Sequence, residues 1–96
     1  MKIVWSERAR EQVLEIFEYI ATERPGVADE ILTGFVERTR LLAEFPQQGV
    51  IWGDGRRPDL RAIYHQSYRI VYRVQPEEVA ILSVRHTRML PESEEG

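Results

Sequence analysis

The residues best suited to bind an anion lie in the last third of the sequence, where arginine is concentrated. Residues 56–90 include seven basic and three acidic side chains, a net charge of +4, although the whole chain carries −3. Twelve of the thirteen basic residues are arginine, and the planar guanidinium binds carboxylate or phosphate through paired hydrogen bonds. A partner responds to the local field more than to the total charge. We therefore predict a binding surface made by five arginines: Arg61, Arg69, Arg73, Arg85 and Arg88.

Structural roles are the alternative to this prediction, both for the arginines and for the histidines. Arginines on a strand often serve as cross-strand charge partners or as the solvated face of a sheet. His86 is the histidine best placed for acid or base chemistry, because unperturbed histidine side chains titrate near pH 6.5. A structural hydrogen bond is an equally good interpretation of this residue. His65 lies in an expected turn and is interpreted as ordinary surface.

No cofactor and no metal ion are expected. The chain has no cysteine, which excludes disulfides and thiolate metal sites. Gly53 and Gly55 do not form a phosphate-binding loop, because their spacing is wrong and no helix follows them.

The first half of the chain predicts a short strand and two helices. Residues 2–5 are expected to form the strand, and Ser6 is a plausible N-cap for the helix that follows. Apolar residues then recur at helical spacing in two stretches, the second running from about Val27 to Glu44. The first stripe consists of Ala9, Val13, Ile16, Phe17 and Ile20, and the second of Ala28, Ile31, Phe35, Leu42 and Phe45. Phe45-Pro46 ends the second helix, and the short link between the helices predicts an antiparallel hairpin.

The second half predicts three antiparallel strands, at residues 60–64, 68–74 and 79–86, because the turns between them are short. Alternation places Tyr68, Ile70, Tyr72 and Val74 on one face of the middle strand. If that face is the core, Arg69 and Arg73 point to the other side. The predicted fold is α+β, in the order β-α-α-β-β-β, with the helical hairpin packed on one face of a small antiparallel sheet.

The length of 96 residues fits one domain, which we assign to residues 1–90, followed by a loose acidic tail at residues 91–96. No apolar run approaches the roughly 20 residues that span a bilayer. The N-terminus reaches charge too soon for a signal peptide. We therefore expect a cytoplasmic protein that does not interact with membranes.

Four segments together resemble toxins of the RelE/ParE superfamily, and the ParE-like branch in particular. They are Ala9-Arg10 with residues 16–21 (IFEYIA), residues 41–46 (LLAEFP) followed by Gly49, residues 68–74 (YRIVYRV), and residues 79–86 (VAILSVRH) with Arg88. The resemblance covers the chain from Val4 to Pro91. It implies a type II toxin that is neutralised by a cognate antitoxin and forms an oligomer with it.

The resemblance leaves the target open, because a shared fold does not fix the chemistry. ParE-type toxins are known for poisoning DNA gyrase, whereas RelE-type toxins cut messenger RNA on the ribosome. In the ribonuclease branch an arginine of the 68–74 strand serves the phosphate, which points to Arg69, and Arg85 matches a second arginine position. If the protein is a ribonuclease, its catalytic residues are Arg69, Arg85 and His86.

Departures from the ribonuclease pattern favour a gyrase inhibitor that is not an enzyme. No lysine follows Lys2, and no tyrosine or histidine follows Arg88 to act as the terminal acid. Tyr64, Tyr68 and Tyr72 are possible substitutes for that acid, although alternation places Tyr68 and Tyr72 opposite Arg69. The alternatives are a ribosome-dependent mRNA endoribonuclease and a non-toxic module that only binds an antitoxin.

Overall fold

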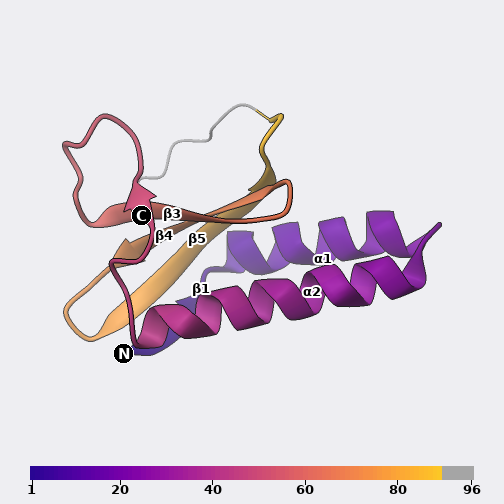
Figure 1. Ribbon diagram of the computed structural model, residues 1–96, viewed down its shortest axis with the longest axis horizontal. Coiled ribbons are helices and arrows are strands. Elements are labelled where there is room, and N and C mark those ends of the chain that lie inside the picture. The colour runs from indigo at the N-terminus through magenta and orange to yellow at the C-terminus, as the bar shows by residue number, and fades with distance from the viewer. Residues whose placement is uncertain (90–96) are drawn as a thin grey trace.

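The computed structural model describes residues 1–89, which form two helices and a five-stranded sheet (Figure 1). The predicted acidic tail at residues 91–96 lies outside the described residues. In chain order the elements are β1 (Lys2–Trp5), α1 (Glu7–Ala21), α2 (Pro25–Arg40), the 3-10 turn η1 (Leu41–Ala43), β2 (Val50–Ile51), β3 (Leu60–His65), β4 (Tyr68–Val74) and β5 (Glu78–His86).

The helical hairpin forms as its sequence predicts. Ser6 caps α1, since its Oγ accepts a hydrogen bond of 3.0 Å from the backbone N–H of Ala9. α2 begins at Pro25, two residues earlier than expected, because proline is well suited to the first position of a helix. It ends at Arg40 and tightens into η1 before Pro46 turns the chain.

The sheet has the strand order β1-β5-β4-β3-β2. The predicted antiparallel meander of β3, β4 and β5 is confirmed. Two features extend it: β1 pairs parallel with β5, and the two-residue β2 pairs antiparallel with β3. The sheet is therefore mixed, with β1 and β2 as its edge strands.

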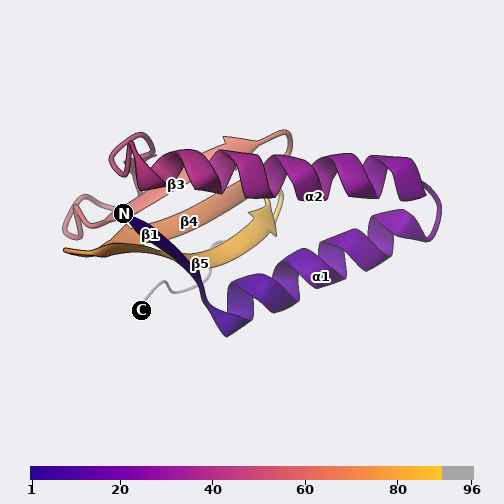
Figure 2. The same ribbon diagram turned by 90° about the horizontal axis from the view of Figure 1, so that it is seen from below.

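Both helices cover the same face of this sheet, as two perpendicular views show (Figures 1 and 2). The apolar stripes of the helices meet the alternate side chains of the strands there. Tyr68, Ile70, Tyr72 and Val74 all face the helices, as alternation predicts. The fully buried members of the core include Ala9, Phe35, Leu42, Ile70, Tyr72, Val79, Ile81 and Val84.

A one-residue irregularity in β5 sets which of its side chains join the core. Val71 lies opposite Ser83, whereas Tyr72 lies opposite Ile81, so Leu82 has no partner in β4. This β-bulge shifts the alternation by one residue. As a result, Ile81 and Val84 both face the helices although they are three residues apart.

The hydroxyl of Tyr72 anchors the turn that leads from the helices into the sheet. It donates a 2.8 Å hydrogen bond to the carbonyl of Pro46 and accepts one of 2.9 Å from the backbone N–H of Gly49. A Cβ at position 49 would lie 2.6 Å from the carbonyl oxygen of Ala62, so the turn can only approach the sheet this closely with glycine.

His65 is not the surface residue that the sequence analysis expects, and it ends β3 rather than lying in a turn. Its ring meets Phe35 edge to face, with centroids 5.8 Å apart. A Cβ on Gly34 would overlap the imidazole. The Nε2 atom is buried with no hydrogen-bond partner in the described part of the chain. His65 therefore packs α2 onto the sheet, at a point where only glycine leaves room for it.

Removing the Tyr72 hydroxyl should destabilise the fold. In Tyr72→Phe the buried N–H of Gly49 loses its acceptor, and a buried unpaired donor costs about 1–3 kcal/mol. We expect a loss of that size in the free energy of unfolding, measured by chemical denaturation. Tyr19→Phe is the control, because Tyr19 is 75% exposed and should change stability by less than about 0.5 kcal/mol. Equal stability of the Tyr72→Phe protein would contradict the anchoring role.

Gly34→Ala should also destabilise the protein, although alanine is the better helix former by about 1 kcal/mol. The added methyl group must displace the imidazole of His65, and overpacking of this kind costs about 1–3 kcal/mol. In the double variant Gly34→Ala/His65→Ala the clash is absent, so the part of the unfolding free energy that the clash removes should be recovered. A double-mutant cycle would measure this coupling. Gly26→Ala is the matched control, because a Cβ there meets nothing within 4 Å. Additive effects at positions 34 and 65 would rule out the contact.

Candidate functional site

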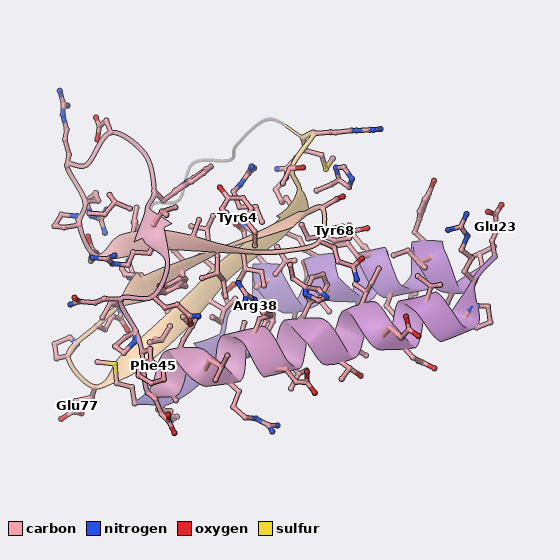
Figure 3. All side chains as sticks on the ribbon, in the orientation of Figure 1. Glu23, Arg38, Phe45, Tyr64, Tyr68 and Glu77 are labelled. Atoms are coloured by element: carbon pink, nitrogen blue, oxygen red, sulfur yellow. The ribbon has the colours of Figure 1, made fainter. Side chains whose placement is uncertain are left out.

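Three predicted or candidate residues form a row across the face of the sheet that the helices leave free. Tyr64 of β3, Arg69 of β4 and Arg85 of β5 are successive partners in the sheet register. Tyr64 is 42% exposed, and Figure 3 shows its side chain on the side away from the helices. The structure thus brings Arg69 and Arg85 together, and adds a phenol beside them.

Arg69 is more buried than the prediction of an open surface implies, with only 8% of its area exposed. Its guanidinium carbon lies 4.6 Å from the centroid of the Trp52 ring, which is a cation–π contact. Trp52 directly follows β2, so the contact reaches from one edge of the sheet across β3 to β4. Sequence reasoning missed Trp52, and a lone tryptophan between a turn and a glycine-rich loop carries no periodic signal that would reveal it.

Short side chains occupy the row of the sheet next to that of Tyr64, Arg69 and Arg85. Ala62, Val71 and Ser83 form the neighbouring row in β3, β4 and β5. Each is only 1% exposed, although no helix covers this face. The contact between Trp52 and Arg69 joins the β2 edge of the sheet to β4, across β3.

Arg73 lies on the same face as Arg69, further along β4. The positive charge of Arg73 acts on the Asp59 carboxylate. Arg57 donates hydrogen bonds of 3.1 and 2.9 Å to the same carboxylate. The hydrogen bond from Arg57 is the main reason that the pKa of Asp59 lies below its usual value, and the charge of Arg73 adds to it. Asp59 thus serves mainly to hold Arg57.

His86 lies outside the row of Arg69 and Arg85, so this row does not bring together all three residues of the predicted catalytic set. Its partner in the register is Tyr68 on the helix side, and the two rings meet edge to face with centroids 5.4 Å apart. Its Nδ1 accepts a 3.0 Å hydrogen bond from the backbone N–H of Arg88. The physical reason is that neighbours in a strand point to opposite faces, although both residues line a hollow of about 560 Å³ between α1 and the end of β5.

Arg61 also lies away from the other predicted arginines. It pairs in register with Tyr72, on the helix side. Its Nη1 donates to the carbonyls of Gly49, at 2.8 Å, and Gln47, at 3.2 Å. Arg61 therefore supports the turn after α2. Arg88 is exposed in the turn that follows β5.

The tyrosines are divided between the two faces in the same way. Burial raises the pKa of Tyr68 and of Tyr72, so both keep their protons at neutral pH on the helix side. Tyr64 is the tyrosine of β3 and β4 that shares the face of Arg69. This face can therefore bind an anion and stack against a flat ring, and it presents one phenol as a possible acid.

Three hollows lie along the helices, and the smallest of them, of about 560 Å³, is lined by both Arg85 and His86. A cleft of about 700 Å³ opens at the end of the helices, lined in part by Tyr19, Tyr68 and His86. A larger groove of about 830 Å³ runs between β1 and the helices, and its lining is mostly apolar. It includes Leu14 and Val36, which are 55% and 42% exposed.

Within residues 1–89, no three histidine, aspartate or glutamate side chains gather closely enough to hold a metal ion. None of the helices in that same part of the chain has the length and apolarity needed to cross a membrane.

Two solved structures share this architecture. A structure of the chromosomal ParDE toxin–antitoxin system from P. aeruginosa matches 90% of this chain and 95% of its own, with a TM-score of 0.74 and 20% identity. The toxin–antitoxin complex RelBE2 from Mycobacterium tuberculosis matches 88% of this chain and 95% of its own, with a TM-score of 0.65 and 23% identity. At these identities the two structures establish the shared fold.

No curated protein sequence matches this chain significantly. The family model for the ParE toxin of the type II toxin–antitoxin system parDE matches residues 3–91. Because this match spans nearly all of the sequence, the chain belongs to the ParE toxin family.

Proposed function

We propose that this protein is the toxin of a type II toxin–antitoxin pair, that it traps DNA gyrase on cut DNA, and that a cognate antitoxin neutralises it. The observation that carries the proposal is that the row of Tyr64, Arg69 and Arg85 holds no histidine, because His86 pairs with Tyr68 and packs against its ring. It leaves a cationic binding face without the histidine that RNA cleavage would use. Such inhibition would take place in the cytoplasm and would restrain growth or stabilise a plasmid.

Cleavage of RNA by its own 2′-hydroxyl needs a base, an acid and cations held around one phosphate, each within hydrogen-bond reach. The row of Tyr64, Arg69 and Arg85 offers two cations and one phenol. The phenol could serve as the acid, and this is what supports the ribonuclease as second candidate. The row contains no residue suited to act as the base, so binding without chemistry accounts for it better.

The antitoxin fits the groove between β1 and the helices. Exposed apolar side chains such as Leu14 and Val36 are costly on the surface of a monomer when they gather beside a hollow. β1 is also an edge strand of the sheet, so its outer backbone groups are available to a partner chain. A segment that folds as it binds can use both features.

Inducing the protein in bacteria should produce gyrase-dependent DNA breaks and altered plasmid supercoiling, while mRNA 5′ ends stay unchanged. The double variant Arg69→Gln/Arg85→Gln should reduce the breaks by about tenfold, as expected when central interface residues are lost. Arg40→Gln is the matched control, because Arg40 is exposed on α2, on the other side of the sheet. Gel analysis of plasmids and mapping of breaks would measure both effects.

Three results of this experiment would count against the proposal. New mRNA ends at specific codons, without DNA damage, would establish the ribonuclease, and Tyr64→Phe and Arg69→Ala should then abolish cutting. A wild-type protein that leaves growth unchanged would be a module that only binds an antitoxin. DNA breaks that persist in cells with a resistant gyrase would place the target elsewhere.

The double variant Leu14→Asp/Val36→Asp should escape the antitoxin. Burying two carboxylates in an apolar contact is unfavourable, so the affinity for the antitoxin should fall by about a hundredfold or more. Titration calorimetry would measure this, and co-expression of the antitoxin should no longer restore growth. Leu41→Asp is the control, because Leu41 is exposed but does not line the groove. Retention of full affinity by the double variant would place the antitoxin on another surface.

A further inference from the structure

We propose that Trp52, Tyr64 and Arg69 form a binding site for a single strand of nucleic acid on the helix-free face. Bases would stack on the two aromatic rings, and a phosphate would bind between Arg69 and Arg85. The inference deepens the proposed function and rests on it, since gyrase handles DNA whose strands it has cut. It assigns a role to Trp52, which no sequence motif marks.

The first argument is the unusual state of Arg69. The side chain is more than nine-tenths buried, and its contact within the described residues is with the Trp52 ring. No carboxylate or carbonyl of that part of the chain binds the guanidinium. Stacking on the ring uses the face of the guanidinium, and its five N–H donors lie in the plane of the group, where an anion can accept from them.

The second argument is the placement of Arg85 directly opposite Arg69. Partners in the register of an antiparallel pair have Cβ atoms about 4.5–5.5 Å apart, so both guanidinium groups can reach one ligand. An anion placed between the two residues would be attracted by both charges. A phosphate suits the position, because it can accept hydrogen bonds from two guanidinium groups at once.

The third argument is the pair of aromatic rings around Arg69. Trp52 stacks on the guanidinium from the β2 side, and Tyr64 stands next to it in the sheet register. Tyr64 is substantially exposed. Aromatic faces and arginine planes are the surfaces on which unpaired bases stack, and every base can use them.

These features favour a nucleic-acid strand over an acidic peptide or a duplex. A carboxylate would use the arginines but has no face to stack on the rings. A duplex hides the faces of its bases within the stack. Arg73 also lies on this face, about 13 Å from Arg69 along β4 as judged from the rise per residue, and it would extend the track for the strand backbone.

The test is binding of the purified full-length protein to a fluorescently labelled DNA 12-mer of mixed sequence, followed by anisotropy. An RNA of the same sequence, the annealed DNA duplex and a polyglutamate peptide are the other probes. We expect the single strands to bind more tightly than the duplex or the peptide. The logarithm of affinity should fall with the logarithm of salt concentration, with a slope of about −0.7 for each phosphate contacted.

Trp52→Ala and Tyr64→Ala should each weaken strand binding by about tenfold, which is typical for the loss of one stacked base. Arg69→Lys keeps the charge but loses the planar group, and should weaken binding by about the same factor. Arg40→Ala and Tyr19→Ala are the matched controls, on exposed helical positions, and should change affinity less than twofold. Thermal melting of each variant would identify any that fail to fold.

Tryptophan fluorescence gives a direct readout of the same site. The chain has two tryptophans, so Trp5→Phe leaves Trp52 as the single reporter. Addition of the DNA 12-mer should quench its emission. Quenching and anisotropy should give the same dissociation constant.

Several outcomes would overturn the site: absence of strand binding at low salt, undiminished binding by Trp52→Ala and Tyr64→Ala, or tighter binding of polyglutamate than of either strand. The proposed function can fail or hold independently of this binding site. Strand binding through Trp52 by a protein that does not affect gyrase would uphold the site and refute gyrase poisoning. A Trp52→Ala protein that binds no strand but still traps gyrase would show the reverse. Preference for the RNA strand would uphold the site and shift the target toward mRNA.

Discussion

The position of Leu82 outside the pairing of β4 with β5 is the constraint on which the rest of this structure depends. A strictly alternating strand that buries Val79 and Ile81 would also send Ser83 and Arg85 toward the helices. The extra residue moves Val84 into the core instead and turns Arg85 to the opposite face, beside Arg69. A bulge of this kind leaves backbone groups without a ladder partner, and those groups must be satisfied in another way.

The start of α1 forms hydrogen bonds with backbone groups around the bulge. The Ser6 hydroxyl, which also caps the helix, donates a 3.1 Å hydrogen bond to the carbonyl of Leu82, and the backbone N–H of Ser6 donates to Ile81 at 2.9 Å. Gln12, one turn and a half further along α1, accepts a 2.8 Å hydrogen bond from the backbone N–H of Val84. β1 ends opposite Ile81, so beyond that point α1 takes the place of the missing strand. The cap, the bulge and the face of Arg85 are therefore one connected arrangement.

Local patterns predicted the helices, the meander and the facing of β4, because each depends on periodicity or on short turns. The remaining features depend on contacts between distant segments. The parallel pairing of Lys2 with Glu78 joins opposite ends of the chain, and β2 is too short to show alternation. The helix-side positions of His86 and Arg61, and the stacking of Trp52 on Arg69, follow from the bulge and the register, neither of which a single sequence reveals.

The same bulge also bears on how one fold supports different toxins. Arg85 and His86 are neighbours in the chain, and a strand can present only one of two neighbours to a given face. Arg85 lies beside Arg69 and forms a pair of cations with it, whereas His86 packs against Tyr68. A surface with two cations, a tryptophan and a tyrosine is well equipped to hold a charged, flat ligand, and poorly equipped to move the protons that cleavage requires. The register of β5 thus decides at once which of its side chains enter the core and which functional groups stand beside Arg69.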